Sequence, residues 1–357
     1  MFSTAAAARG AGASRAALAL ALLLGGCAAH LVPAGRPVAP ARETARVFVM
    51  PDGMRLPYRV WRPTGHPCGR PSALVLALHG MDDSRDAFAI PAPAFTAAGV
   101  ELIAPDQRGF GATAVRGYWP GRRTLVADAR TMVGLLAARH PGVPIYVMGE
   151  SMGAAVAMLL AAGRHPPPVA GWILVSPAVW GWQELNPFER AGLWLMIHVA
   201  PDVSVGGGGL HIVASDNRAA LRALGRDPLT LLATRWDAIG GLVRLMGAAA
   251  AAAPRLPGDA LVLYGGKDQL VPARAMRAMW HALRPPPTGP RIAFYPDGYH
   301  LMLRDLGRAE PLGDILGWMR APRARLASGA GGAARRWMGG RRMLAAALPR
   351  HAARADP

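Results

Sequence analysis

A serine in a glycine-flanked turn is the strongest chemical signal in this sequence. Residues 149–153 read Gly-Glu-Ser-Met-Gly and fit the pattern Gly-x-Ser-x-Gly. They follow an apolar run at 144–148 and lead into an Ala- and Leu-rich stretch, which predicts a strand, a tight turn and a helix. In such a nucleophile elbow the neighbouring residues are small and the hydroxyl stands clear of the sheet. Ser151 is therefore the candidate nucleophile, and the alternative is an ordinary helix N-cap.

A serine hydroxyl needs a base to take its proton, and the sequence offers one together with a carboxylate. Asp268 follows an apolar run at 260–264, and His300 follows another at 291–295. Both would lie in loops at the carboxyl ends of strands, where an open α/β sheet gathers its site. We expect His300 to be the general base and Asp268 to hold its tautomer. Asp297 is the alternative acid.

The same chemistry needs two amide donors for the oxyanion of the tetrahedral intermediate. One should be the backbone N–H of Met152, directly after the nucleophile. The other should come from the loop after an early strand, and Met81 follows the apolar run at 72–78. We expect His79 to shape this loop rather than to act as a base.

Alternating strands and helices are expected to position these residues. Apolar runs typical of buried strands alternate with stretches of helical periodicity, which predicts an α/β fold with a mostly parallel sheet and helices on both faces. The expected strands are 46–50, 56–61, 72–78, 100–104, 144–148, 171–175, 260–264 and 291–295, and the expected helices are 125–140, 152–162, 273–283 and 310–320. Between about 180 and 254 the alternation stops and no clear strand appears, so we interpret this segment as an inserted helical lid.

The presumed lid is rich in large apolar side chains. Trp180, Trp182 and Trp194 are the candidates for contact with a substrate. Their alternative role is to form the core of the lid itself. An apolar lid above the serine would suit an acyl chain.

The composition excludes several other classes of protein. With 357 residues, 52% of them hydrophobic and 17% charged, the chain can bury a large core. The formal net charge of +18 could attract nucleic acid or anionic membranes. No zinc-finger spacing, Walker loop or RNA-binding signature accompanies it, so we expect no nucleic-acid partner, no metal and no cofactor. The two cysteines exclude a disulfide framework, and the sequence carries no signal for an oligomeric state.

The N-terminus has the features of a secretion signal. Arg9 and Arg15 precede an apolar run at 16–24, which is too short for a permanent membrane helix of about 20 apolar residues. Residues 24–27 read Leu-Gly-Gly-Cys and resemble the lipobox of bacterial lipoproteins. The resemblance implies lipidation of Cys27 and anchoring to a cell-envelope membrane that faces the periplasm. The alanine that follows favours the outer membrane, and the alternative is an ordinary cleaved signal.

Four segments are therefore expected. Residues 1–27 would be the lipoprotein signal, and the Ala- and Pro-rich residues 28–44 would be a tether. Residues 45–321 would be the catalytic domain. Residues 322–357 are rich in Arg, Ala and Gly, and we expect a disordered basic tail, with a membrane-surface segment as the alternative.

Several motifs resemble the monoacylglycerol lipase and lysophospholipase branch of the α/β-hydrolases, the serine aminopeptidase S33 type. The resemblance covers about residues 46–320 and rests on residues 79–81, 106–111, 149–153, 265–268, 271–272 and 298–300. One departure is Phe110, where the family usually has a histidine. The resemblance implies an α/β-hydrolase fold and a serine hydrolase that cleaves carboxylic esters.

The apolar lid and the expected anchor then indicate a single-chain lipid ester, such as a lysophospholipid or a monoacylglycerol. A short-chain carboxylesterase or thioesterase is the nearest alternative. A non-catalytic lipid-binding envelope lipoprotein is the alternative from another class, although binding alone does not require Ser151, Asp268 and His300 together.

Overall fold

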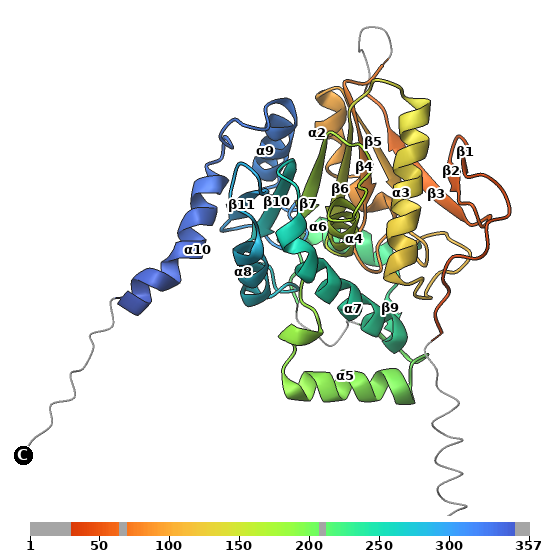
Figure 1. The fold of residues 1–357 in the computed structure, drawn as a ribbon. Helices are drawn as coiled ribbons and strands as arrows, with labels where there is room; N and C mark the ends of the chain where they lie inside the picture. The colour runs from red at the N-terminus through yellow and green to blue at the C-terminus, as the bar shows by residue number, and fades with distance from the viewer. Residues whose placement is uncertain (1–29, 64–69, 207–211, 347–357) are drawn as a thin grey trace, which may run out of the picture.

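A nine-stranded sheet forms the centre of the protein (Figure 1). The computed structural model describes residues 30–63, 70–206 and 212–346. The strand order is β1-β2-β3-β5-β4-β6-β7-β10-β11. The strands are β1 (Arg42–Glu43), β2 (Val47–Val49), β3 (Arg55–Trp61), β4 (Ala73–Leu78), β5 (Val100–Pro105), β6 (Ile145–Glu150), β7 (Gly171–Val175), β10 (Ala260–Gly265) and β11 (Arg291–Tyr295).

The sheet is mostly parallel, as the sequence predicted. All neighbouring pairs from β5 to β11 are parallel, whereas β1, β2 and β3 add an antiparallel edge. Strands β4, β5, β6, β7 and β10 are buried along their whole length, as continuous apolar runs covered on both faces require. The carboxyl ends of the parallel strands consequently meet at one edge, where the loops with the candidate residues begin.

Helices cover both faces of the sheet (Figure 1). Because successive side chains of a strand point to opposite faces, Leu76 of β4 packs in the core with α3, α4 and α8, while Val75 packs in the core with α2 and α9. These elements are η2 (Arg85–Phe88), α2 (Ala92–Ala97), α3 (Arg122–Arg139), α4 (Met152–Ala161), α8 (Ala273–Ala282) and α9 (Ala309–Arg320). The expected fold class is confirmed.

A long insertion follows β7 and returns at β10. Its elements are η3 (Trp182–Glu184), α5 (Pro187–Val199), β8 (Ser204–Gly206), α6 (Arg218–Arg226), β9 (Ala233–Arg235), α7 (Trp236–Ala252) and η5 (Ala253–Arg255). The expectation of no strand here is wrong, because β8 and β9 form a small antiparallel pair. Each has only three residues and no buried side chain, so neither strand produces an apolar run that could be recognised in the sequence. Helix α7 packs on α4, and its Leu245 and Ala249 are buried in the same core, so it belongs to the core as well as to the lid.

The segment before β1 is attached to the domain. The His30 N–H donates to Asp237 Oδ2 at 3.1 Å, and the Val32 N–H donates to the Trp119 carbonyl at 3.0 Å. The prediction of a free tether at 28–44 is therefore wrong from residue 30 onward, because its backbone amides find partners on the domain.

The segment after α9 is ordered in part. Helix α10 (Ala330–Ala346) packs beside the edge strand β11 (Figure 1). Its Trp337 stacks on Phe294, with ring centroids 4.8 Å apart. The prediction of a disordered tail at 322–357 is therefore wrong for α10, since Ala330 and Ala334 are also buried against the domain. Residues 347–357 lie outside the described residues.

The predicted signal peptide at 1–27, with its Cys27, also lies outside the residues that the structure describes. Within residues 30–63, 70–206 and 212–346, no helix combines the length and the apolar character that crossing a membrane requires.

Candidate active site

Ser151 lies in a strained turn between β6 and α4. Its φ of 54° and ψ of −113° are rare for a residue with a side chain. The motif glycines are required because a Cβ on Gly149 would lie 2.3 Å from the Gly153 carbonyl, and one on Gly153 would lie 2.0 Å from the Leu78 carbonyl oxygen. Among the described residues the Ser151 hydroxyl caps no backbone amide of α4, which disfavours the N-cap alternative.

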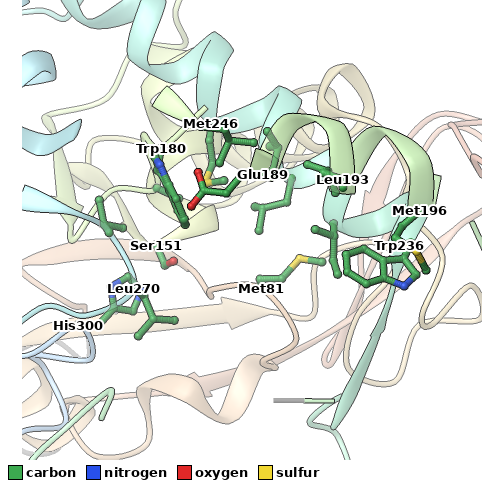
Figure 2. Close-up of a pocket in the computed structure, with 17 residues that line it drawn as sticks. Met81, Ser151, Trp180, Glu189, Leu193, Met196, Trp236, Met246, Leu270 and His300 are labelled. Carbon is green, nitrogen blue, oxygen red and sulfur yellow. The ribbon is translucent and has the colours of Figure 1, made fainter. Parts of the chain in front are cut away.

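His300 and Asp268 meet as the sequence predicted. His300 Nδ1 lies 2.8 Å from Asp268 Oδ2. The other carboxylate oxygen, Oδ1, accepts the backbone N–H groups of Leu270 at 2.8 Å and Val271 at 2.9 Å. Because Nδ1 faces the carboxylate, Nε2 is the imidazole nitrogen that can take a proton. Ser151 and His300 line the same pocket (Figure 2).

The alternative acid, Asp297, lies elsewhere. Its side chain is 89% exposed and pairs with the Lys267 ammonium at 2.7 Å. The Asp268 side chain is fully buried. The structure thus pairs His300 with Asp268 and not with Asp297.

The electrostatic environment of His300 favours the charged imidazolium. Burial by itself lowers the pKa of His300, but the carboxylates of Asp268 and Glu150 outweigh burial and hold this pKa above its ordinary value. An imidazole that gains a proton during the reaction is stabilised by this arrangement.

The loop after β4 passes close to the serine. A Cβ on Gly80 would lie 3.4 Å from the Ser151 Cβ, and the next residue, Met81, lines the pocket that contains Ser151. Met152 is buried at the first position of α4. The two expected donors, the N–H groups of Met81 and Met152, therefore belong to segments that adjoin the hydroxyl. Their action on an oxyanion stays a prediction.

His79 shapes this loop, as expected. Its Nε2 accepts the Gln107 N–H at 3.0 Å, so Nδ1 carries the hydrogen and donates to the Gly80 carbonyl at 2.7 Å. Burial lowers the pKa of His79, which keeps the ring neutral.

A pocket of about 560 Å³ opens above the serine. Figure 2 shows Ser151 and His300 at one end beneath Trp180, with Met196 and Trp236 at the other end. Most of the wall is apolar, and the lining residues are Met81, Ser151, Ala178, Trp180, Leu185, Glu189, Gly192, Leu193, Met196, Trp236, Ile239, Leu242, Val243, Met246, Leu270, Val271 and His300. Such a wall suits a hydrocarbon chain.

The three tryptophans expected to touch the substrate separate into different places. Trp180 lines the pocket. Trp182 packs against the core, and Trp194 is 54% exposed and stacks on His198 on the outside of α5. Trp182 and Trp194 thus lie outside the lining of this pocket, because side chains a few positions apart on a helix or turn face different directions. Contact of the three tryptophans with a substrate stays a prediction.

Sequence reasoning missed the contribution of α7. Trp236, Ile239, Val243 and Met246 recur at helical spacing and all line the pocket. This helical spacing of apolar residues is visible in the sequence, but it does not reveal whether they face the pocket or the core. Within the described part of the chain, no group of His, Cys, Asp and Glu side chains is arranged to hold a metal ion.

This geometry, a serine elbow followed by a buried Asp–His pair at the carboxyl edge of a mostly parallel sheet, defines an α/β-hydrolase. The profile of the family described as serine aminopeptidase, S33 matches residues 69–307, and the chain belongs to this family.

Relatives of known name agree with this assignment. A monoacylglycerol lipase of Mycolicibacterium smegmatis is 29% identical over 277 residues, which cover 76% of this chain and 95% of that protein. The human monoglyceride lipase is 27% identical over 268 residues, which cover 72% of this chain and 84% of that protein.

Solved structures share the fold. The monoacylglycerol lipase of Paleococcus ferrophilus superposes with a TM-score of 0.62 at 19% identity, covering 74% of this chain and 98% of that one. A soluble variant of the monoglyceride lipase from Saccharomyces cerevisiae, in complex with a substrate analog, gives a TM-score of 0.60 at 19% identity, covering 82% of this chain and 97% of that one.

Proposed function

We propose that this carboxylic ester hydrolase cleaves single-chain lipid esters, monoacylglycerols or lysophospholipids, with Ser151 as nucleophile. The observation that carries the proposal is the position of Ser151 and His300 at one end of an apolar pocket of about 560 Å³. An acyl chain lying along this wall would bring its ester carbonyl to the serine. The names of the relatives from Mycolicibacterium smegmatis and human support the same substrate class.

The chemistry proceeds through an acyl-enzyme. The Ser151 hydroxyl attacks the ester carbonyl while His300 Nε2 takes its proton, and Asp268 stabilises the imidazolium. The N–H groups of Met81 and Met152 bind the oxyanion, a contribution typically worth about 3 kcal/mol for one donor. His300 then gives the proton to the leaving alcohol. A water molecule, deprotonated by the same histidine, releases the fatty acid and restores the serine.

Exposed apolar side chains next to the pocket also support a lipid substrate. Helix α5 lines the pocket with one face, and elsewhere it exposes Phe188 (89%), Trp194 (54%), Leu195 (50%) and Val199 (54%). Large exposed apolar patches on soluble domains typically mark contact surfaces. Such a helix suits an enzyme that takes its substrate from a lipid surface.

A lipid anchor at Cys27 belongs to the same proposal and would hold the protein on an envelope membrane facing the periplasm, with the outer membrane favoured. The test is incorporation of radiolabelled palmitate into the full chain and into Cys27→Ala, followed by membrane fractionation. Label and membrane association should both be lost in the variant. Equal labelling of the two proteins would refute the anchor.

The substrate is tested with the protein lacking its first 27 residues. The p-nitrophenyl esters of acetate, butyrate, octanoate, decanoate and palmitate are compared, followed by monoacylglycerol, lysophosphatidylcholine and an aminoacyl anilide. We expect kcat/KM to rise from acetate to octanoate or longer, and Ser151→Ala to abolish turnover.

The possible outcomes separate the alternatives. A maximum at acetate or butyrate would indicate a small-ester esterase that uses the same residues. Turnover of the anilide alone would indicate a peptidase. Folded protein with no turnover and no labelling by a fluorophosphonate probe would leave the lipid-binding lipoprotein as the better explanation.

A further inference from the structure

A buried ionic cluster lies beside the candidate site, and the mechanism above does not use it. The Arg304 guanidinium bridges two carboxylates, with Nη2 within hydrogen-bond distance of Asp83 Oδ2 and 2.7 Å from Glu150 Oε2. The three residues are 5%, 6% and 1% exposed, respectively. Ionic groups buried this deeply contribute little net stability, because their desolvation offsets their attraction. Their presence therefore calls for another explanation.

The cluster connects the three segments that carry the reacting groups. Asp83 lies two residues after Met81 on the loop that follows β4. Glu150 directly precedes Ser151, and Arg304 lies four residues after His300. The Asn217 amide of the lid also donates to the Arg304 carbonyl at 2.9 Å. A shift of Arg304 would thus disturb three segments together: the loop after β4 that carries Met81 (the oxyanion loop), the turn that carries Ser151, and the loop that carries His300.

The charges of the cluster do not cancel. Burial raises the pKa of Glu150, and the Arg304 guanidinium opposes this by favouring the carboxylate. With Glu150 and Asp83 both ionised, one guanidinium faces two carboxylates, and the negative charge of Glu150 acts on His300. Such a charge stabilises the imidazolium that forms when the histidine takes the serine proton, and a water-excluded site strengthens the interaction.

We propose that Glu150 and Arg304 are positioning residues for the hydrolytic reaction, with Glu150 acting as a second carboxylate toward His300 and Arg304 fixing Glu150 and the oxyanion loop in place. This inference rests on the proposed function, in which His300 is the general base. It assigns a role to the residue before the nucleophile that the triad alone does not require.

The charged groups around His300 have opposing effects on its pKa. Asp268 faces it from the loop after β10, Glu150 from β6 and Arg304 from its own segment. Burial lowers the pKa of His300 most strongly, Asp268 and Glu150 raise it, and Arg304 lowers it. On the loop after β4, Asp83 pairs with Arg304, and burial holds His79 neutral.

Glu150 and Arg304 shift the pKa of His300 in opposite directions, which gives a test. Residues with a purely structural role would not move this pKa in opposite directions when replaced. Glu150→Gln removes a negative charge at nearly constant shape, so the pKa of His300 and the acid limb of kcat/KM should move down by about half a pH unit or more. Arg304→Gln removes a positive charge and should move both up. Asp297→Asn removes an exposed carboxylate near His300 in sequence and should move neither.

A second readout tests positioning. Arg304→Lys keeps the charge but lacks the planar fork, so we expect kcat to fall about tenfold with KM for the octanoyl ester unchanged. Circular dichroism and a thermal melt establish that each variant is folded. Where Arg304→Gln does not fold, Glu150→Gln decides the question alone.

The pKa of His300 is also followed by NMR titration of its ring, which needs no substrate. Opposite displacements for Glu150→Gln and Arg304→Gln support the inference. No displacement in folded Glu150→Gln, or displacement of both variants in one direction, overturns it. If the wild-type protein hydrolyses no ester yet the NMR shifts appear, the proposed function has failed while the electrostatic coupling stands.

Discussion

Asp268 and His300 are joined by a hydrogen bond of 2.8 Å in which the carboxylate is already fixed from its other side. Its second oxygen accepts two backbone amides, from Leu270 and Val271. The carboxylate therefore cannot turn away from the imidazole, and the ring has one orientation to adopt. This preorganisation requires no movement at the moment when charge develops on the histidine.

The first prediction concerns this pair. Asp268→Asn replaces a carboxylate by an amide that can stabilise the wrong imidazole tautomer, so kcat should fall by about three to four orders of magnitude. Asp297→Asn is the matched control and should leave kcat within about a factor of two, because its side chain is 89% exposed. Steady-state hydrolysis of an octanoyl ester measures both. A large loss in Asp297→Asn with little loss in Asp268→Asn would reverse the assignment of the acid.

A second prediction concerns pH. The pKa of His300 is raised above 6.5 by Asp268 and Glu150, which outweigh burial. The base works only as the neutral imidazole, so activity should be complete above this raised pKa and should be lost as the pH falls through it. The profile of kcat/KM should therefore show an acid limb with its midpoint above 6.5. A midpoint clearly below 6.5 would mean that burial dominates over the carboxylates.

The third prediction tests the pocket through Gly192. A Cβ at this position meets no atom within 4 Å, and Gly192 shares the pocket-lining face of α5 with Glu189, Leu193 and Met196. Gly192→Leu should fill the pocket and lower kcat/KM for decanoyl or longer esters about tenfold or more, while acetyl ester turnover is kept. Replacing a glycine within a helix should not destabilise α5.

Gly225→Leu provides the control for Gly192→Leu. Gly225 also has open space at its Cβ and lies within a helix, α6, but it does not line the pocket. Its chain-length profile should match that of the wild-type protein. An unchanged profile in Gly192→Leu would show that the acyl chain lies elsewhere.

The fourth prediction concerns Asp82, which joins the oxyanion loop to the lid. Its carbonyl accepts the Leu231 N–H at 2.8 Å, and its carboxylate accepts the Thr234 hydroxyl. Burial raises the pKa of Asp82 from 3.8 to about 6. Protonated Asp82 therefore stabilises the folded state relative to the unfolded state. This stabilisation is fully present below the ordinary pKa of 3.8 and is lost as the pH rises through about 6.

Asp82→Asn removes this titration and tolerates the φ of 62° that Asp82 adopts. The free energy of unfolding in urea, measured at about pH 4.5 and about pH 7.5, should therefore change less with pH in the variant than in the wild-type protein. Identical changes in both proteins would show that Asp82 keeps an ordinary pKa.

The sequence predicted those parts of the fold and site that rest on local patterns. The buried strands are continuous apolar runs; Ser151 directly follows one of them, and Asp268 and His300 lie in the loops that follow two others. Their positions at the carboxyl edge then follow from the parallel order of the strands. The mutual contact of Asp268 and His300 required no knowledge of the lid.

The parts that the sequence did not predict depend on contacts between distant segments. Whether Trp180 or Trp194 faces the pocket depends on how the lid lies on the sheet, which no local pattern encodes. No motif in the sequence singles out Arg304, whose contacts with Asp83 and Glu150 exist only in the folded chain. The same holds for Trp337, whose partners come from β10, α8 and β11, well before it in the chain.

The last prediction concerns this attachment of α10. Trp337 stacks on Phe294 at 4.8 Å between ring centroids, contacts Trp280 at 5.3 Å, and carries the Arg277 guanidinium 3.9 Å above its ring. Trp337→Ala should therefore lower the free energy of unfolding by about 2 kcal/mol or more, measured by urea denaturation. Because α10 packs on β11 and none of its described side chains lines the pocket, kcat/KM of the folded variant should stay unchanged. Arg336→Ala, an exposed neighbour, is the control. Equal stability of the two variants would show that the aromatic cluster does not hold the helix.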